Sequence, residues 1–197
     1  VMSENTKEQW IAMWETNRGC PFTCKWCDWG SATAASVNRF DIDRLYKEID
    51  WFVDHQIEYV FCADANFGIL SRDVDIAKRL VDAKLKTGYP KRFAMQSAKN
   101  LKERSFDLQK MLTDAGMNQG VVVAMQSLNP ATLDAVGRKN INLNDFKDNQ
   151  ARFVKSGIET LTDLIVAQPL ETYETWVKGV DELLNLGQHN RINFTTL

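Results

Sequence analysis

Three of the four cysteines in this 197-residue chain lie within eight residues of one another. Cys20, Cys24 and Cys27 follow a CxxxCxxC spacing, and Cys62 stands alone downstream. Neighbouring thiols in a reducing compartment serve as metal ligands or redox pairs more often than as structural disulfides. Three thiolates on one loop can bind three irons of a 4Fe–4S cluster. The fourth iron then has no protein ligand and can bind a substrate.

A structural zinc site is the alternative use of these thiols. Zinc normally takes four protein ligands, usually in two pairs, and Cys62 is the one remaining thiol. Neither His55, in an expected helix, nor His189, after a helix end, has a partner at ligand spacing. The shortage of fourth ligands therefore favours an iron–sulfur cluster over zinc.

The elements that must position this loop alternate between short β-type runs and amphipathic helical stretches. We expect six strands, at residues 11–16, 58–63, 91–98, 120–127, 158–169 and 191–196. Helices are expected from Asp41, Asp73, Leu101, Asn144 and about Thr172, with a short helical turn at Asn129. Strands joined by helical crossovers must be parallel, and right-handed crossovers curl such a sheet toward a barrel or wind it doubly. The pattern predicts an α/β fold and leaves that choice open.

The composition favours a compact globule without a strongly charged partner. Apolar residues make up 44% of the chain and the formal net charge is −2, so no overall field attracts nucleic acid or an anionic membrane. No window approaches 18 uninterrupted apolar residues, and the first residues lack the basic-then-apolar order of a signal peptide. We expect a cytoplasmic protein with neither a membrane nor a nucleic-acid partner.

We expect residues 1–197 to form a single domain, because no linker rich in Pro, Gly or Ser interrupts them. Residue 1 is Val rather than Met, and the chain stops within what reads as an internal strand. These features predict a domain truncated at both ends.

The cysteine loop resembles that of the radical S-adenosylmethionine superfamily, in which CxxxCxΦC follows the first strand and Φ is aromatic, here Trp26. The resemblance implies a partial (β/α)6 TIM-like barrel of parallel strands. It also implies that Cys20, Cys24 and Cys27 hold the cluster while S-adenosylmethionine chelates the fourth iron. The implied reaction is reductive cleavage to a deoxyadenosyl radical that abstracts hydrogen from an unidentified substrate. The electron donor is expected to be a protein such as flavodoxin or ferredoxin.

The segment after the second expected strand stands where the family has a glycine-rich motif that meets the methionine amino group. Here the glycines are missing, and Asp64 and Asn66 form the Asp-x-Asn-Phe variant of cobalamin-associated members. The resemblance implies that both side chains contact the ligand. A solvated turn is the alternative, because Asp and Asn are ordinary turn residues.

The segment ending the fourth expected strand is similar to the family's QSxN…L…R signature. The resemblance implies that Gln126 and Ser127 approach the ribose hydroxyls and that Arg138 pairs with the methionine carboxylate. A guanidinium suits a carboxylate because it donates two parallel hydrogen bonds. A solvated charge at a helix end is the alternative for Arg138.

The fifth expected strand resembles the family's DxIxGxPxET segment, which embraces adenine. The resemblance implies that Val166 and Gln168 line the adenine site. Ala167 replaces the usual glycine and narrows the freedom of the backbone there.

Cobalamin-associated members, many of which methylate unactivated carbons, are the subclass that this chain resembles. It carries no Asp-x-His-x-x-Gly cobalamin motif, so cobalamin is expected only through a domain before Val1. A radical enzyme without cobalamin, acting in RNA modification or peptide maturation, is a second possibility. From another class comes an iron–sulfur electron-transfer or structural metal module without S-adenosylmethionine chemistry. An electron carrier would normally ligate its cluster with four protein groups.

Overall fold

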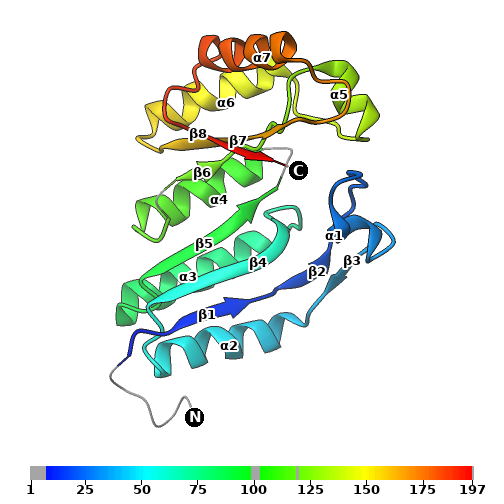
Figure 1. The fold of residues 1–197 in the computed structure, drawn as a ribbon. Helices are drawn as coiled ribbons and strands as arrows, with labels where there is room; N and C mark the ends of the chain where they lie inside the picture. Colours follow the sequence, from blue (N-terminus) through cyan, green and yellow to red (C-terminus); the bar gives the residue numbers. More distant parts are fainter. Residues whose placement is uncertain (1–7, 99–102, 119, 197) are drawn as a thin grey trace. The chain divides into compact units, whose positions relative to one another are not determined.

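The computed structural model describes residues 8–98, 103–118 and 120–196. Its strands pair in parallel and alternate with helices, which confirms the expected α/β class (Figure 1). The described residues fall into two compact units. The first unit takes those of Val1–Arg18, Val37–Ala98 and Glu103–Gln119, and the second takes those of Gly19–Ser36 and Gly120–Leu197. The single domain expected from the sequence stays a prediction.

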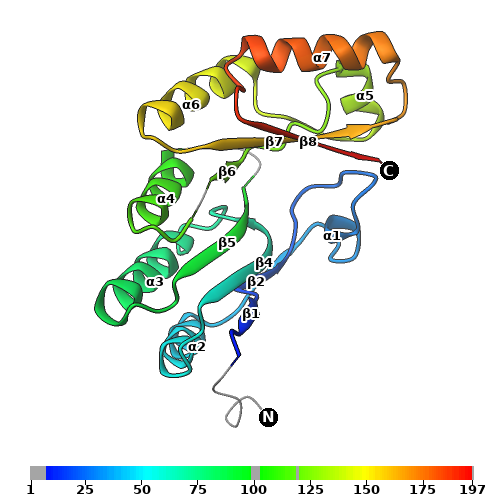
Figure 2. The same cartoon turned by 60° about the vertical axis from the view of Figure 1, so that its left-hand side comes forward.

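The first unit is built on a three-stranded parallel sheet of order β1-β4-β5. Its strands are β1 (Ile11–Trp14), β4 (Tyr59–Phe67) and β5 (Arg92–Ser97), and its helices are α2 (Ile42–Asp54), α3 (Asp73–Thr87) and α4 (Glu103–Asp114). Ile11 of β1 lies opposite Tyr59, which in turn lies opposite Arg92. Helices α2 and α3 cover one face of this sheet (Figures 1 and 2). Two short strands, β2 (Asn17–Gly19) and β3 (Val37–Arg39), pair separately beyond β1.

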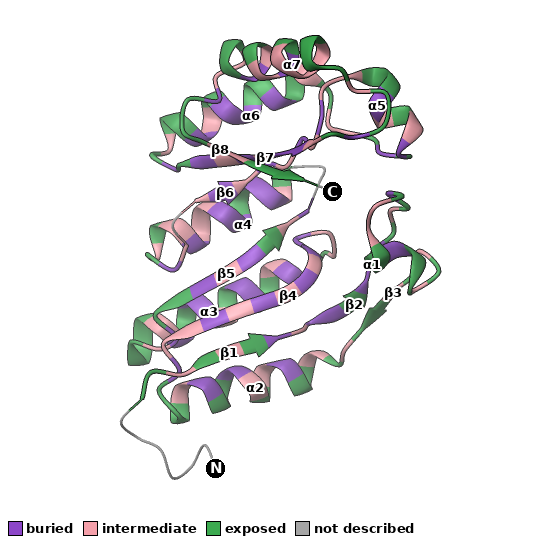
Figure 3. Cartoon of the chain, viewed as in Figure 1, coloured by how far each residue is buried: buried purple, intermediate pink, exposed green. Residues whose placement is uncertain are grey.

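Helix α2 shows why these residues form these elements. The side chain of Asp41 accepts a hydrogen bond from the Arg44 N–H at 3.0 Å, which caps the first turn as the sequence predicts. Leu45, Ile49 and Phe52 recur on one face of the helix and are buried, and Phe52 meets the edge of the Trp14 ring. Figure 3 shows buried and exposed residues along α2, and buried residues alternating with partly exposed ones along β4.

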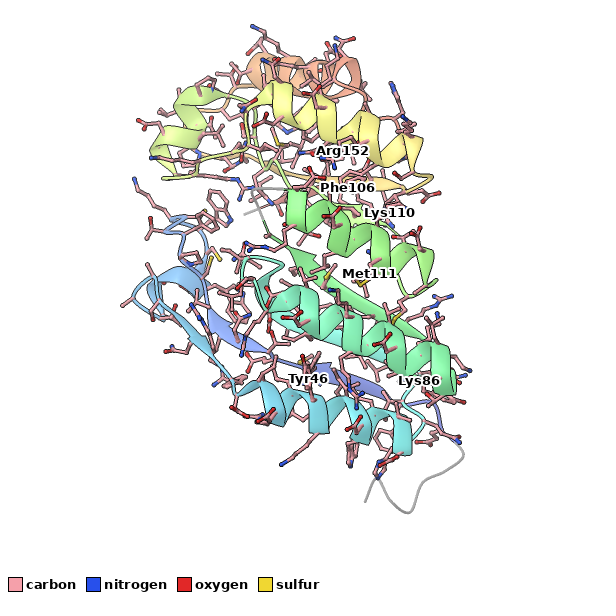
Figure 4. All side chains as sticks on the ribbon, turned by 180° about the vertical axis from the view of Figure 1, so that it is seen from behind. Tyr46, Lys86, Phe106, Lys110, Met111 and Arg152 are labelled. Carbon is pink, nitrogen blue, oxygen red and sulfur yellow. The ribbon has the colours of Figure 1, made fainter. Side chains whose placement is uncertain are left out.

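Helices α2 and α3 are joined partly by contacts of one arginine side chain. Tyr46 of α2, labelled in Figure 4, lies under the Arg79 guanidinium of α3 at 6.0 Å from the ring centroid. Arg79 also pairs with Asp50 of α2. These exposed contacts add little stability compared with the apolar packing beneath them.

The second unit has its own three-stranded parallel sheet of order β6-β7-β8. Its strands are β6 (Val121–Val122), β7 (Thr160–Val166) and β8 (Arg191–Thr196), and its helices are α1 (Asp28–Ser31), α5 (Pro130–Ala135), α6 (Leu143–Lys155) and α7 (Tyr173–Asn185). Helices α6 and α7 cover one face of this sheet (Figure 2). Asn129 caps α5 by accepting from the Ala131 N–H, as its place before Pro130 predicts.

Three local expectations need correction. The strand expected at 120–127 is regular only at Val121–Val122 and returns as one bridge at Gln126, because Gln126 has a left-handed φ of 66°. Asp73 does not cap α3. Arg72 is the N-cap residue, and the Asp73 carboxylate instead accepts from the upstream N–H groups of Gly68 and Leu70. The helix expected from Leu101 is described from Glu103, and Leu101 lies outside the described residues.

No helix among the described residues combines the length and hydropathy that a membrane crossing needs.

A buried amide network joins β7, α6 and the end of α7. Gln188 is fully buried and accepts from the Gln150 Nε2 at 2.6 Å, and its own Nε2 donates to the carbonyls of Thr160 and Arg191. The Thr160 hydroxyl donates to Gln150 at 2.7 Å. The network satisfies polar groups that the interior would otherwise leave unpaired.

We expect Gln188→Ala to lower the free energy of unfolding by about 2–4 kcal/mol, since several buried groups lose their partners at once. Urea unfolding followed by circular dichroism measures the change. Gln9→Ala, at an exposed position before β1, is the matched control and should change it by no more than about 0.5 kcal/mol. Equal effects of the two substitutions would contradict the assigned network.

Candidate functional site

The cysteine loop has no helix or strand of its own between Cys20 and Cys27. It leaves β2 at Gly19 and runs into α1, where Cys27 is the N-cap residue. Cys20 and Cys24 are 3% and 5% exposed, and Cys27 is half-buried. The Cys27 N–H donates to the Cys24 carbonyl at 3.0 Å, so these two cysteines share one tight turn.

The loop is held by contacts with residues far along the chain. The Lys25 N–H donates to the Val136 carbonyl at 3.0 Å, and the Lys25 Nζ donates to the Ala135 carbonyl at 2.6 Å. Both carbonyls lie at the carboxyl end of α5, where a helix leaves acceptors unpaired and attracts cations. On the other side, a Cβ atom at Gly30 would lie 1.8 Å from the Phe22 carbonyl oxygen. Only glycine permits α1 to approach the loop this closely.

Arg138 lies against the same loop and is 5% exposed. Its Nε donates to the Asn140 Oδ1 at 2.7 Å, and its Nη2 donates to the Ala124 carbonyl. Its Cζ stands 5.8 Å from the centroid of the Trp26 ring, which is half-buried. The expectation that Arg138 is simply a solvated charge therefore does not hold.

The guanidinium of Arg138 also faces the thiols. Burial lowers its pKa, and its hydrogen bond and charge interaction with Cys24, followed by the charges of Cys27 and Cys20, raise the pKa again. Arginine stays charged in either case. All three cysteines thus lie within electrostatic reach of one buried positive charge.

The donor set fits an iron–sulfur cluster. In the described part of the chain, no three His, Cys, Asp or Glu side chains are arranged to hold a single metal ion. A cluster sets a different demand, because each thiolate binds a separate iron of the cube. Three thiols on one loop, two of them buried, together with a buried cation that offsets negative charge, satisfy that demand.

The ends of β6 and β7 bring together the residues expected at the ribose and adenine. The Ser127 hydroxyl donates to the Glu171 Oε1 at 2.6 Å, and the Gln168 Nε2 donates to the Gln126 carbonyl at 2.9 Å. Ser127 and Gln168 are buried, whereas Gln126 and Val166 are half-buried. These four residues lie in the same unit as the cysteine loop.

Two acceptors at these strand ends have no donor. The Gln168 Oε1 and the Glu171 Oε2 are both buried and accept no hydrogen bond. Leaving such a group unpaired costs on the order of 1–3 kcal/mol, and more for a charged group. Buried unpaired groups are rare in native structures, so these two acceptors mark a candidate ligand site. Ala167, directly before Gln168, has a φ of 64° and stands where the resemblance expects glycine.

Asp64 and Asn66 lie on β4 in the first unit and are both buried. The Asp64 Oδ1 accepts from the Thr16 and Asn17 N–H groups at 2.7 and 3.2 Å, and its Oδ2 accepts from the Asn17 Nδ2 and the Thr16 hydroxyl. Burial raises the pKa of Asp64 and these hydrogen bonds lower it. The carboxylate is therefore fully used within the protein, at the corner where β1 leads to β2 and the cysteine loop.

Two residues of this region escaped the sequence analysis. Glu171 lies inside the segment resembling DxIxGxPxET, so its place in that motif was an available signal. No signal in the sequence pointed to Asn140, because its role depends on backbone carbonyls 13 and 15 residues away.

Comparison with known proteins fits this geometry. The Radical SAM superfamily model matches residues 14–183, and the chain belongs to that family. It is 44% identical over 184 residues to 2-(S-pantetheinyl)-carbapenam-3-carboxylate methyltransferase of Streptantibioticus cattleyicolor, covering 93% of this chain and 27% of that protein. It is 42% identical over 181 residues to the cobalamin-dependent radical SAM methyltransferase TokK of Streptomyces tokunonensis, covering 92% and 27%. The chain thus spans about a quarter of these relatives.

Among solved structures, the radical S-adenosylmethionine methyltransferase TsrM from Kitasatospora setae matches with a TM-score of 0.72 and 18% identity. The match covers 94% of this chain and 35% of TsrM, and shows that the chain has the fold expected of the family, a partial TIM-like barrel. Family membership also confirms the expected cofactor class, a 4Fe–4S cluster with S-adenosylmethionine. One of the two curated relatives, TokK, is named as cobalamin-dependent.

Asp73 gives the first unit a pH dependence. It is fully buried, and burial raises the pKa of its carboxyl from 3.8 to about 6. The N–H groups of Leu70 and Gly68 and the charge of Arg72 lower this pKa, while Asp64 raises it. Since the pKa of Asp73 is higher in the folded state, folding favours the protonated carboxyl. Its contribution to the free energy of unfolding is therefore complete below about pH 4 and is lost as the pH rises through about 6.

We expect the free energy of unfolding to fall by about 2 kcal/mol between pH 4.5 and 7.5 from this group. Asp73→Asn should flatten that dependence, because its amide oxygen can still accept from Gly68 and Leu70. Urea unfolding across this pH range measures it, and Asp75→Asn, at an exposed position of the same helix, is the control. Parallel profiles for the wild type and Asp73→Asn would refute the assignment.

Proposed function

We propose that this chain is the cofactor-binding core of a radical S-adenosylmethionine enzyme whose cluster is held by Cys20, Cys24 and Cys27. The observation that carries the proposal is the CxxxCxxC loop, with Cys20 and Cys24 buried and the buried guanidinium of Arg138 in electrostatic reach of all three thiols. When bound, the reduced cluster supplies the electron that cleaves S-adenosylmethionine to a radical able to abstract hydrogen. The protein's task is to hold both cofactors in one geometry and exclude water.

The chain's own residues divide this task. Trp26 shields the thiol turn and lies over Arg138, whose guanidinium can offset the charge of the thiolates or of a methionine carboxylate. Gln126, Ser127 and Gln168 position the strand ends toward the nucleoside part, with Val166 offering apolar surface to adenine. The unpaired Glu171 Oε2 and Gln168 Oε1 can accept from hydroxyl or amino groups of the ligand.

Asp64 and Asn66 take a supporting part in this proposal. Because the Asp64 carboxylate is already saturated by Thr16 and Asn17, it secures the corner that leads to the cysteine loop. Contact with the methionine amino group would require exchange of one of those hydrogen bonds. Asn66, two residues further along β4, stays the proposed contact of this strand.

The reaction class follows from the relatives. Both curated relatives above 40% identity are methyltransferases, and one is named as cobalamin-dependent. We propose that the protein containing this chain methylates a carbon of an unidentified substrate, with cobalamin held by another domain. We further propose that a flavodoxin- or ferredoxin-type protein donates the electron. We also propose a cytoplasmic location, because the free cysteines and the cluster need a reducing compartment.

Anaerobic reconstitution of the full-length protein with iron and sulfide, followed by dithionite and S-adenosylmethionine, tests radical initiation. Deoxyadenosine detected by mass spectrometry is the expected product. We expect Cys24→Ala to lose the cluster and all product, because two thiolates do not hold the cube securely. Iron and sulfide analysis measures the cluster directly.

Cys62→Ala is the matched control. Cys62 is fully buried in the first unit, and burial followed by the charge of Asp64 raises the pKa of its thiol well above the usual range. Such a thiol is a poor ligand, so this variant should keep its cluster. A full cluster in Cys24→Ala, or a full cluster with neither product nor a spectral response to S-adenosylmethionine, would favour an electron-transfer or structural metal module.

The strand-end acceptors generate a separate prediction. Glu171→Gln replaces one acceptor oxygen by an NH2 group, and we expect the Kd for S-adenosylmethionine to rise about tenfold or more with the iron content unchanged. Equilibrium binding to the reconstituted protein measures it. Glu159→Gln, at an exposed position at the opposite end of β7, should leave the Kd unchanged. Equal Kd values for the wild type and Glu171→Gln would exclude Glu171 from the ligand site.

A further inference from the structure

Asn140 joins two parts of the second unit that the proposed function treats separately. Its Nδ2 donates to the Met125 carbonyl at 2.7 Å and to the Ser127 carbonyl at 2.8 Å, on either side of Gln126. Its Oδ1 accepts from the Arg138 Nε at 2.7 Å. One amide therefore ties the end of β6 to the guanidinium that faces the cysteine loop.

Arg138 depends on this tie for its position. A long, rotamer-rich side chain stays in one place only when its donors find fixed acceptors. Among the hydrogen bonds that set its direction, Nη2 donates to the Ala124 carbonyl and Nε donates to Asn140. These two bonds hold two of the three guanidinium nitrogens and leave the charge next to Trp26 of the loop.

We infer that Asn140 is a positioning residue of the iron–sulfur site. It fixes the Arg138 charge beside the thiolates of Cys20, Cys24 and Cys27. It also holds that charge at a constant position relative to the Gln126–Ser127 strand end. This inference rests on the proposed function, because it requires that these thiols hold a cluster.

The chemistry of Asn140 suits this role. A residue needed only to close the strand end would use its two N–H donors on carbonyls, as Asn140 does with Met125 and Ser127. The Asn140 Oδ1 also accepts a hydrogen bond from Arg138, which orients the guanidinium without adding a charge. An Asp here would offset the guanidinium, whereas the neutral amide leaves its full charge facing the thiolates.

A fixed cation next to thiolates has a measurable consequence. Reduction adds one negative charge to the cluster, and a nearby positive charge favours the reduced form. If Asn140 holds Arg138 in place, loss of Asn140 lets the guanidinium move away or become hydrated. The cluster then becomes harder to reduce, although no ligand has changed.

A double-mutant cycle tests this in the reconstituted full-length protein without S-adenosylmethionine. The midpoint potential of the cluster is measured by redox titration with electron paramagnetic resonance in the wild type, Asn140→Ala, Arg138→Met and the double variant. We expect Arg138→Met to lower the ratio of reduced to oxidised cluster at a fixed potential about tenfold, or 59 mV for one electron. Asn140→Ala should shift it the same way by a smaller amount. In the Arg138→Met background, Asn140→Ala should add nothing.

Asn142→Ala is the matched control, since Asn142 is exposed and caps α6 through the Asp145 N–H. It should lose some stability and keep the wild-type potential. If Asn140→Ala does not fold, Asn140→Ser, which keeps one donor, replaces it. A wild-type potential in the folded variant, or the same shift with and without Arg138, would overturn the inference. Failure of the wild type to assemble a cluster would instead reject the proposed function, and the inference with it.

Discussion

The cysteine loop cannot position its own thiols. From Cys20 to Cys27 it has no regular hydrogen-bonded structure, so fixing it costs backbone entropy that other segments must offset. The offset comes from Lys25, which binds the carboxyl end of α5 some 110 residues away, and from Arg138. The segment after β6 must fold before the thiols have a defined place. The geometry of the site is therefore a property of the second unit as a whole.

Asp64 and Arg138 are both buried ionisable groups, and the cost of removing each from water is offset in a different way. The Asp64 carboxylate is surrounded by donors from Thr16 and Asn17, so its charge is compensated within the protein. Arg138 donates hydrogen bonds to one backbone carbonyl and one side-chain amide. It also interacts with thiols, which become strong acceptors only when they are deprotonated. A saturated group suits a structural corner, whereas a group that still faces ligand atoms suits a cofactor site.

The sequence predicted those features that depend on local pattern. Helix α2 begins where Asp41 predicts, and five of the six expected strands lie within a few residues of their places, because period and capping are local. The strands β2 and β3 and the helix α1 have three or four residues each, too few to show a period. The regular part of β6 ends at Val122, and the left-handed angle of Gln126 further along is not predicted by its residue type. The cysteine spacing marked the proposed cluster ligands, but the saturation of Asp64 and the bridge made by Asn140 depend on partners that only the fold brings near.

Several unsatisfied and strained groups of the second unit lie on the segments that follow β6 and β7. Gln126 and Ala167 hold left-handed angles, while the Gln168 Oε1 and the Glu171 Oε2 are buried without donors. Each of these features costs on the order of 1–3 kcal/mol in the free protein. A ligand that supplies donors relieves part of that cost, so binding is favoured without further rearrangement of the strands. Asn140 and Arg138 join the segment after β6 to the side of the cysteine loop through hydrogen bonds, so the proposed ligand site and the thiol loop belong to one hydrogen-bonded frame. A fixed frame of this kind is the condition under which a reactive intermediate can be directed rather than lost to water.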